Sequence, residues 1–328
     1  MKNRKPVLID CDTGIDDAIA LTIAAAADNI EILAVTAVAG NTTVDNSTRN
    51  TCNVLHLLGR DEIPVAKGAA KPLVRELMTA GSVHGRSGLR GWNFESDYTD
   101  NLSPLSAVGL MTEKILEAED KVTLIALGPV TNIEALLRLH PETKERIGEI
   151  VFMGTSYHSG NPTALSTFNV LVDPEAFREV LHSGVPVTAC PLETTRKSFL
   201  TADDRRRIRD IGNIPSAFVT SVLSGYGELL ETKNDDRTDD TAVIEDCGLP
   251  VPMHDPTTVA YVIRPELFTG TKYYADVECS GSLTLGFTLI DRENYYRKSE
   301  EEKNLFFLEN IDREGFVSLF LESLRKYR

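Results

Sequence analysis

The sequence predicts an α/β protein in which a mostly parallel, open sheet carries helices on both faces. Short apolar runs of strand length alternate along the chain with longer segments that have one apolar helical face. This alternation is typical of βαβ units, whose buried parallel strands are apolar without interruption. In addition, acidic residues gather where the first apolar run ends, and open α/β sheets bind ligands at the carboxyl ends of their strands.

The expected strands are runs of apolar residues bounded by polar or turn-forming ones. They are Val7–Ile9, Ile32–Ala37, Val122–Leu127, Ile150–Met153 and Val187–Ala189. The expected helices lie between these strands and repeat apolar residues at helical spacing. They are Asp16–Ala27, Val44–Leu58, Ser106–Glu117, Asn132–Leu139 and Pro174–Ser183.

The C-terminal third of the chain is less regular. It predicts a helix over Pro215–Thr232, a strand pair at Lys272–Glu278 and Leu283–Asp291, and a closing helix over Gly315–Lys326. The glycine-rich stretch from Met78 to Asn101 is expected to be a long functional loop near the top of the sheet. Because no low-complexity linker or internal repeat interrupts the chain, we expect residues 1–328 to form a single domain.

The composition limits the function classes. Of the 328 residues, 42% are hydrophobic and 25% are charged, which is ordinary for a soluble globular protein. A net charge of −15 argues against a nucleic acid or an anionic membrane as partner. No apolar run has membrane-spanning length, and the first residues lead directly into a strand, so we expect no membrane span and no signal peptide. The five scattered cysteines are typical of reduced thiols in a cytoplasmic protein, and they are Cys11, Cys52, Cys190, Cys247 and Cys279.

The segment VLIDCDTGIDDAIAL (Val7–Leu21) places four aspartates between residues 10 and 17, where a strand ends and a helix begins. Two carboxylates about 5 Å apart repel each other by roughly 3 kcal/mol at an effective dielectric constant near 20. A helix N-terminus offers only about half a positive charge in compensation. A bound cation therefore explains the run of acids better than solvation does. Asp10 and Asp12 alternate with Cys11 and are expected to point the same way.

Two familiar acidic motifs fit this segment poorly. An EF-hand loop counted from Asp10 needs Asp or Asn, Gly and Glu at its fifth, sixth and twelfth positions, where this chain has Gly14, Ile15 and Leu21. A haloacid-dehalogenase-type phosphatase has Thr or Val two residues after the second Asp, where this chain has Gly14. A phosphatase therefore remains a distant alternative. The full phrase D-x-D-x-G-x-D-D is better interpreted as a calcium site joined to a sugar site.

The segment IDCDTGIDDAIAL closely resembles the N-terminal signature of the nucleoside hydrolases, the inosine–uridine-preferring ribohydrolases. Further segments resemble that family's blocks in its order, and the resemblance covers about residues 5 to 265. They are AVAGNTT (Ala37–Thr43), VHGRSGL (Val83–Leu89), ALGPVTNIEAL (Ala126–Leu136), FMGTSYHSGNPTALSTFNVLVDPEA (Phe152–Ala176), PLETTRK (Pro191–Lys197) and PMHDPTTVAYVI (Pro252–Ile263). The resemblance implies a Rossmann-like nucleoside hydrolase fold. It also implies hydrolysis of an N-ribosidic bond through an oxocarbenium-like state attacked by water.

The resemblance also implies a role for each matching residue. One calcium ion is expected, bound by Asp12, Asp17, Asp255 and the backbone carbonyl of Leu127. Asp12 is further expected to act as general base on the metal-bound water, with Asp10 supporting it from behind, and Asp16 to hold the ribose 2′-hydroxyl. His254 is expected to protonate the departing base. Additional substrate contacts are expected from Asn41, His84, Met153, Asn161, Thr167 and Asn169.

On the residues alone, several of these positions have simpler interpretations. Leu127 would end a strand before an ordinary turn, and Asp255 before a proline would be a common helix start. Arg86 and Arg90 add positive charge near the expected entrance, but a solvated loop is favoured over a role in binding an anionic substrate. The remaining histidines are expected to be structural, and they are His56, His140, His158 and His182.

One position departs from the family's pattern. Thr167 stands two residues before Asn169, where the family generally has a Glu that grips the ribose 5′-hydroxyl together with Asn161. The departure leaves the expected water-activating residues unchanged and puts the ribosyl specificity in question. A ribohydrolase for 5′-modified ribosides therefore stays open as an alternative. Independently of Thr167, so does a non-catalytic riboside-binding or sensing protein that retained the site but lost turnover. The base preference also stays open, and the resemblance suggests a homodimer or homotetramer that takes part in nucleoside salvage.

Overall fold

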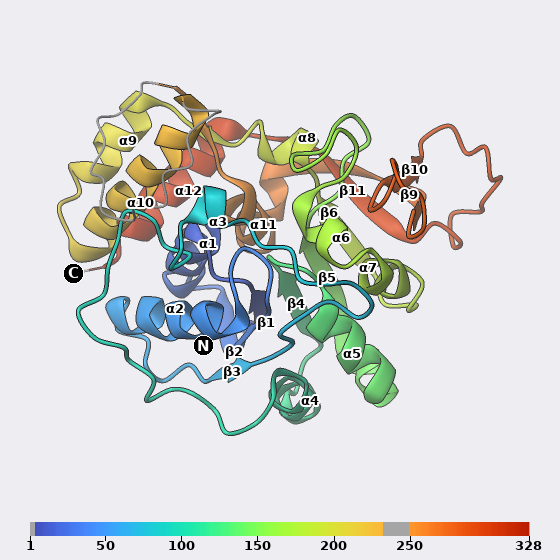
Figure 1. Ribbon diagram of the computed structural model, residues 1–328, viewed down its shortest axis with the longest axis horizontal. Coiled ribbons are helices and arrows are strands. Elements are labelled where there is room, and N and C mark those ends of the chain that lie inside the picture. The colour runs from blue at the N-terminus through green and yellow to red at the C-terminus, as the bar shows by residue number, and fades with distance from the viewer. Residues whose placement is uncertain (1–3, 232–248, 328) are drawn as a thin grey trace.

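The computed structural model describes residues 4–231 and 249–327, and it is built around a nine-stranded sheet (Figure 1). The strands are β1 (Lys5–Cys11), β2 (Ile30–Ala37), β3 (Val65–Lys67), β4 (Val122–Ala126), β5 (Ile147–Met153), β6 (Val187–Cys190), β7 (Phe199–Leu200), β8 (Val251–Pro252), β9 (Phe268–Val277), β10 (Thr288–Asp291) and β11 (Leu305–Ile311). Their order in the sheet is β10-β9-β11-β6-β5-β4-β1-β2-β3, and β7 pairs with β8 outside it. Neighbours from β11 to β3 are parallel, whereas β9 is antiparallel to both β11 and β10. This mostly parallel open sheet confirms the predicted fold class.

Helices surround the sheet. They are α1 (Ile15–Ala25), α2 (Val44–Leu57), α3 (Gly81–His84), α4 (Ala107–Glu117), α5 (Thr131–Leu139), α6 (Phe168–Val172), α7 (Pro174–Leu181), α8 (Leu192–Thr195), α9 (Ala202–Arg209), α10 (Ile214–Glu231), α11 (His254–Ile263) and α12 (Arg313–Arg325), with short 3₁₀ helices at Pro141–Arg146 and Pro265–Leu267. Over residues 4–231 and 249–327, no helix combines the length and the apolar character needed to cross a membrane.

Two separate apolar layers cover the two faces of the sheet. One layer joins α1, α2, α10, α11 and α12, and the other joins α4, α5 and α7. Strand β1 contributes to both layers because its side chains alternate: Val7 and Ile9 belong to the first layer and Leu8 to the second. The prediction of helices on both faces is therefore confirmed.

Local capping explains why several helices begin where the sequence predicts. Thr43, Ser106 and Asp173 precede α2, α4 and α7, and each side chain accepts a backbone N–H from the first helical turn. These bonds satisfy donors that have no partner inside the helix. Because a capping residue is visible in the sequence, such boundaries can be predicted to within about a residue.

The sequence predictions were incomplete in the C-terminal third. Strand β11 was not predicted, although it lies inside the sheet between β9 and β6 and buries Leu305, Phe307 and Leu308. The predicted strand from Leu283 is wrong at its start, because β10 begins at Thr288 and Leu283 is 89% exposed. The predictions also missed β3, β7, β8 and the helices α3, α6, α8 and α9, whereas the helix start suggested by Asp255 is present as α11. The end of the predicted helix at Thr232, and Cys247, lie outside the described residues.

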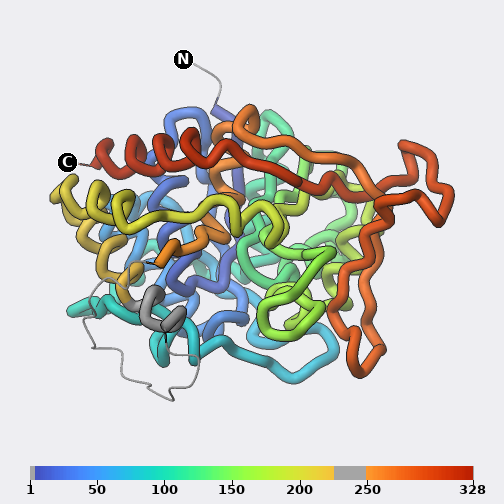
Figure 2. Tube along the Cα trace, turned by 90° about the horizontal axis from the view of Figure 1, so that it is seen from above, coloured from blue at the N-terminus to red at the C-terminus, as the bar shows by residue number. Residues whose placement is uncertain are grey.

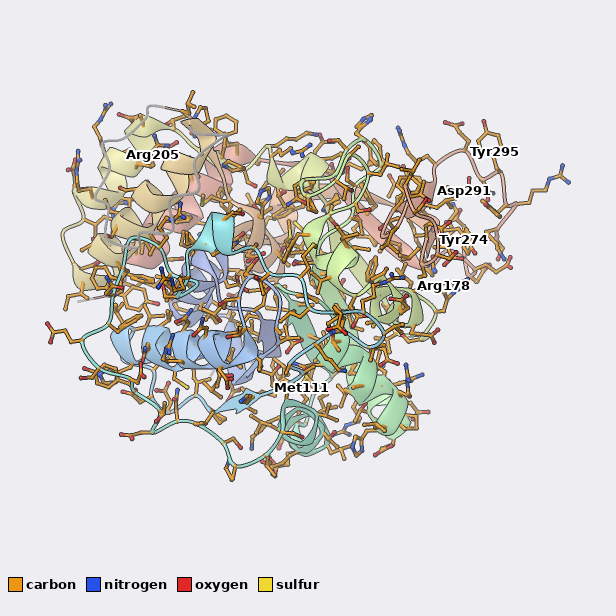
Figure 3. All side chains as sticks on the ribbon, viewed as in Figure 1. Met111, Arg178, Arg205, Tyr274, Asp291 and Tyr295 are labelled. Atoms are coloured by element: carbon orange, nitrogen blue, oxygen red, sulfur yellow. The ribbon has the colours of Figure 1, made fainter. Side chains whose placement is uncertain are left out.

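Strands β9 and β10 form an antiparallel arm that projects from one side of the molecule (Figures 1 and 2). Asp291 of β10 is paired with Tyr274 of β9, and Tyr295 lies farther along the arm (Figure 3). The Asp291 carboxylate accepts the backbone N–H groups of Tyr295 and Tyr296, each at 2.8 Å, and so closes the turn after β10. The arm lies at one edge of the sheet, and β1, β2 and β3 lie at the opposite edge.

Candidate active site

Three acidic residues meet where two helices begin. Asp16 and Asp17 lie in the first turn of α1, and Asp255 lies in the first turn of α11, which packs against α1. Ligand oxygens of these three carboxylates all lie within 4.8 Å of one another. Asp17 and Asp255 are buried and Asp16 is partly buried. The fold thus joins two acidic segments that are far apart in the sequence.

Asp12 follows the end of β1 and is held in one orientation. Its Oδ2 accepts the backbone N–H of Asn41 at 2.6 Å, and its Oδ1 accepts the Asn41 side-chain amide at 3.1 Å. Two glycines allow the chain to pass close to this carboxylate. A Cβ at Gly40 would lie 2.1 Å from Asp12 Oδ2, and a Cβ at Gly128 would lie 2.8 Å from Asp12 Cγ. Only glycine fits at such distances from neighbouring atoms.

Asp17 is connected to Asp12 through backbone and side-chain bonds. Its Oδ1 accepts the N–H of Asp12 at 3.1 Å, and its Oδ2 accepts the N–H of Gly14 at 3.0 Å. The side-chain amide of Asn41 donates to Asp17 Oδ2 at 3.0 Å as well as to Asp12. Asn41 therefore bridges the two carboxylates and keeps them side by side.

Asp10 lies deeper than the other acids, on strand β1 itself. Its Oδ1 accepts the hydroxyl of Thr36 at 2.5 Å and the side-chain amide of Asn132 at 2.8 Å. Its Oδ2 is buried and has no hydrogen-bond partner among the described residues. Burial raises the pKa of Asp10 from 3.8 to about 7, against the lowering effect of these two hydrogen bonds. Thr36 and Asn132 were not singled out from the sequence, although Asn132 lies in the quoted block ALGPVTNIEAL.

The acids are costly to charge in the absence of a cation. Burial, followed by repulsion from Asp17, raises the pKa of Asp16 to about 7. Burial and the same repulsion raise the pKa of Asp12 well above 3.8. The pKa of Asp255 is raised well above 3.8 by burial and by its acidic neighbours, Asp16 first. The pKa of Asp17 is also raised, with burial as the main cause.

A hard cation fits this donor set. Asp16 Oδ1 is buried without a hydrogen-bond partner among the described residues, next to the other two carboxylates of the cluster. Calcium takes several oxygen ligands, including carboxylates and backbone carbonyls. The carbonyl of Leu127 is a further oxygen at this site, and it accepts the side-chain amide of Asn169 at 2.5 Å. The close cluster contains Asp16 in place of Asp12, which the resemblance had assigned as a ligand.

A cavity of about 470 Å³ opens above these acids, a volume within the range of roughly 300–1,000 Å³ that is usual for small-molecule sites. Asp12 and Asp17 are joined to this cavity through Asn41, which lines it. The other expected site residues that line it are Asp16, His84, Leu127, Met153, Asn161, Thr167, Asn169, His254 and Asp255. Its apolar lining comes mainly from Met78, Ala80, Val83, Pro162, Phe168 and Pro252.

A larger hollow of about 890 Å³ lies at the opposite ends of the strands. It is lined by residues 24–28, at the end of α1, and by residues 30–33, at the start of β2. Its charged lining residues Arg60 and Lys114 form ion pairs with acids beside them. The smaller cavity is the better candidate active site, because Asp16 and Asp255 of the acid cluster line it and it lies at the carboxyl ends of the strands.

Two histidines line the cavity, and each has one ring nitrogen engaged. His84 ends α3, and its Nδ1 accepts the backbone N–H of Ile15 at 3.1 Å, so its Nε2 bears the hydrogen. Burial and the charge of Arg90 lower the pKa of His84 to about 3. His254 begins α11, and its Nδ1 is 2.7 Å from the hydroxyl of Thr195. Burial lowers the pKa of His254 to about 4, so both rings are neutral near pH 7.

The wall formed by residues 161–169 is built from amides and hydroxyls. The side-chain amide of Asn169 donates to the carbonyls of Leu127 and Met153, at 2.5 and 3.0 Å. The hydroxyl of Thr167 accepts the backbone N–H of Thr155 at 3.0 Å. On the same wall, Asn161 Oδ1 accepts the backbone N–H that follows Thr167, at 2.9 Å.

Helix α8 was missed by the sequence predictions, although PLETTRK was quoted as a block. Besides the contact from Thr195 to His254, it carries Glu193, whose Oε1 accepts the hydroxyl of Ser156 at 2.6 Å and the N–H groups of Tyr157 and His158, each at 3.1 Å. Glu193 thereby holds the loop that leads to Asn161. No local signal in the sequence indicates this role, because the contacts join segments that are distant along the chain.

The prediction of a solvated loop was wrong for Arg90, which is only 6% exposed. Neither Arg86 nor Arg90 is among the described residues that line the cavity. The remaining histidines also lie outside its lining: His56, His140 and His182 are near carboxylates, and His158 is beside Tyr157.

Comparison with known proteins identifies the family. The family model described as inosine-uridine preferring nucleoside hydrolase matches residues 7–318. The chain belongs to this nucleoside hydrolase family. It is 41% identical over 323 residues to the pyrimidine-specific ribonucleoside hydrolase RihA of Citrobacter koseri, with 98% of each chain covered. It is 39% identical over 322 residues to RihA of Escherichia coli, with 98% of this chain and 99% of the relative covered.

Solved structures agree with this assignment. The structure of this chain is similar to that of a purine-preferring ribonucleoside hydrolase from Gardnerella vaginalis, with a TM-score of 0.86, 27% identity and 98% of each chain covered. It is also similar to an inosine-guanosine nucleoside hydrolase, with a TM-score of 0.84, 26% identity and 99% of each chain covered. As a member of this family, the protein is an enzyme that hydrolyses N-glycosidic bonds.

Proposed function

We propose that this enzyme is a calcium-dependent hydrolase that cleaves ribonucleosides into free base and ribose. The observation that supports the proposal most strongly is the cluster of Asp16, Asp17 and Asp255 beneath a cavity that also holds His254. Hydrolysis of an N-ribosidic bond needs an activated water, a grip on the ribose hydroxyls and a proton for the departing base. The cavity offers candidate residues for all three.

Asp12, Asp17, Asp255 and the carbonyl of Leu127 are the proposed calcium ligands. Calcium bound there would acidify a coordinated water and help to orient the ribose hydroxyls. Asp12 takes the proton from the attacking water, and the two bonds from Asn41 hold its carboxylate for that step. Asp16 accepts the ribose 2′-hydroxyl, consistent with its partly exposed position in the cavity lining. Asp10 supports this arrangement from strand β1.

His254 is the proposed donor to the departing base. When the Thr195 hydroxyl donates to Nδ1, the ring hydrogen resides on Nε2, on the ring edge away from Thr195. That N–H can then hydrogen-bond to the base as negative charge develops on it, and complete transfer of the Nε2 proton follows when Nδ1 takes up a proton in its place. His84 presents a second Nε2–H to the cavity, and with Asn41, Met153, Asn161, Thr167 and Asn169 it completes the proposed substrate contacts.

Pyrimidine nucleosides are the proposed first choice of substrate, supported by relatives near 40% identity that are named pyrimidine-specific. The structural neighbour from Gardnerella vaginalis is named purine-preferring at 27% identity, so both base classes belong in the test. Ribose release should be measured for uridine, cytidine, inosine and adenosine, with calcium and with a chelator. Ribose release that depends on calcium supports the proposal. Tight binding without release would instead identify a riboside-binding protein, and release of phosphate from a generic ester would identify a phosphatase.

We further propose that residues 1–328 act as one domain, in a cytoplasmic homodimer or homotetramer that serves nucleoside salvage. The shared sheet supports the single domain, because β1 and β11 from opposite ends of the chain belong to it. Sedimentation analysis of the purified protein tests the oligomeric state.

A further inference from the structure

The wall of the cavity formed by Asn161 and Thr167 presents hydrogen-bond donors, and we infer that it accepts ribosides whose 5′ position offers an acceptor but no donor. Such ribosides include 5′-ethers and 5′-esters. The inference rests on the proposed function and refines its substrate class. It follows from which atoms of the two side chains are already engaged.

Thr167 has one lone pair engaged and its proton available. Its hydroxyl oxygen accepts the backbone N–H of Thr155, and the residue is only 3% exposed. Among the described residues, no acceptor receives the hydroxyl hydrogen of Thr167. A buried hydroxyl hydrogen without an acceptor is unfavourable, so an acceptor atom on a bound ligand would stabilise it.

The contact to Thr155 holds the Thr167 oxygen in place. Thr155 has a φ of 74°, a left-handed conformation that is uncommon for a β-branched residue. It follows strand β5, which brings Met153 into the cavity lining. The Thr167 hydroxyl therefore has a structural partner on one side and a free hydrogen on the other.

Asn161 is oriented by its neighbour in the same way. Its Oδ1 accepts the backbone N–H of Phe168 at 2.9 Å, and an N–H group can only face the oxygen of the amide. The Nδ2 donor is therefore turned away from Phe168, and Asn161 lines the cavity. Neither Asn161 nor Thr167 carries a carboxylate, so this wall does not require a hydroxyl hydrogen from the ligand.

The geometry of ribose connects this wall with the 5′ position. With the 2′- and 3′-hydroxyls at the acids, the base on C1′ and the C5′ group on C4′ leave the ring on opposite sides of its oxygen. The proposed function places the base at His254, so the C5′ group reaches the polar wall formed by Asn161 and Thr167. Pro162 and Phe168 adjoin that wall in the cavity lining and provide apolar contact for a small 5′ substituent.

The test compares uridine, 5′-O-methyluridine and 5′-deoxyuridine by kcat/KM. In the wild type, 5′-O-methyluridine should be used within about threefold of uridine, because its ether oxygen still accepts. Loss of the acceptor in 5′-deoxyuridine should reduce kcat/KM by about two- to tenfold, as expected for one neutral hydrogen bond. Thr167→Ser should keep this order. A wild-type preference for uridine over 5′-O-methyluridine of more than about thirtyfold would overturn the inference.

Asn161→Asp provides the sharper variant, because it exchanges the amide donor for a carboxylate oxygen of similar size. The second oxygen can still accept from Phe168, so the fold should be kept. The carboxylate needs a donor, and the preference for uridine over 5′-O-methyluridine should rise by roughly ten- to hundredfold. Asn294→Asp adds the same charge on the exposed arm and should leave the ratio unchanged. An unchanged ratio in Asn161→Asp would remove Asn161 from the 5′ wall.

The same three compounds should also be titrated calorimetrically, because their dissociation constants report the polarity of the wall without turnover. If none of the compounds is hydrolysed but their affinities follow the expected order, the proposed function fails and the inference stands. If uridine is hydrolysed and the affinity order is reversed, the proposed function stands and the inference fails.

Discussion

Removal of the proposed calcium ion should make the stability of this enzyme depend on pH in a direction set by the acid cluster. Burial and repulsion from Asp17 raise the pKa of Asp16 from 3.8 to about 7. An unfolded chain releases this proton near pH 4, whereas the native chain keeps it until about pH 7. Between these values the native state binds more protons, so the free energy of unfolding falls as the pH rises. Asp12, Asp17 and Asp255 also have raised pKa values and act in the same direction.

The size of the effect can be worked out for Asp16 alone. One carboxyl changes the free energy of unfolding by about 1.4 kcal/mol per pH unit within its window, so about 2 kcal/mol is lost between pH 5.5 and pH 7. At about 2.1 cal/mol/K of unfolding entropy per residue, a chain of 328 residues loses about 1.5 °C of Tm per kcal/mol. The chelated protein should therefore melt about 3 °C lower at pH 7 than at pH 5.5, and more if the other acids contribute.

Calcium should reverse this trend, because a bound cation favours the charged carboxylates. At a free calcium concentration 100 times the dissociation constant, binding adds about 2.7 kcal/mol to the free energy of unfolding. Differential scanning fluorimetry of chelated and calcium-loaded protein across pH 5.5–7.5 measures both effects. The calcium-induced rise in Tm should be larger at pH 7.5 than at pH 5.5, since calcium competes with protons at the lower pH.

Two variants separate the cluster from other titrating groups. Asp16→Asn should flatten the pH dependence of the chelated protein by about 1.4 kcal/mol per pH unit between pH 5.5 and 7. Asp203→Asn is the matched control, because Asp203 is also an acid in a first helical turn but its side chain is 66% exposed. A chelated wild type with equal Tm at both pH values, or an equal slope in Asp16→Asn, would refute the electrostatic reasoning.

Further predictions concern composition and catalysis. Elemental analysis of protein purified without chelator should find about one calcium per chain, and zinc in its place would contradict the proposed ligands. Asp12→Asn should lower kcat by roughly 10²–10⁴-fold with little change in substrate affinity, and a loss confined to KM would exclude a general base. His254→Ala should impair uridine hydrolysis and spare a nitrophenyl riboside, whereas equal losses would exclude proton donation. Thr195→Val should lower kcat on uridine by about two- to tenfold, and Thr195→Ser should restore it. A Thr195→Val variant with wild-type kcat would show that Thr195 does not orient His254.

Most of the N-terminal half of the fold could be predicted because its signals are local, although short elements such as β3 and α3 were missed there. Apolar runs show the central strands, and Thr43, Ser106 and Asp173 show where their helices begin. The position of β11 could not be predicted in this way. It follows β10 in the chain but lies between β9 and β6 in the sheet, and that order depends on long-range packing of residues such as Phe307.

The candidate site shows the same difference between local and long-range signals. The excess of acid around Asp12 and Asp17 is visible in a single short segment, and physical reasoning from that segment alone predicts a cation. The position of Asp255 in the cluster depends on the packing of α11 against α1. In the sequence, only the resemblance to a family indicated that position. The contact from Thr195 to His254 joins the end of α8 to the start of α11, which are far apart in the sequence. The structure was therefore needed to find it.

The origin of the acids explains why the cluster needs protons or a cation. Asp16 and Asp17 begin α1, and Asp255 begins α11, so two helix N-termini together offer about one positive charge. Together with Asp12 the cluster has four carboxylates, and three of them are buried. The two dipoles thus offset only part of the charge, and protons or a cation must supply the remainder. At pH 7 a divalent cation can do so while leaving Asp12 unprotonated, which is the state that a general base requires.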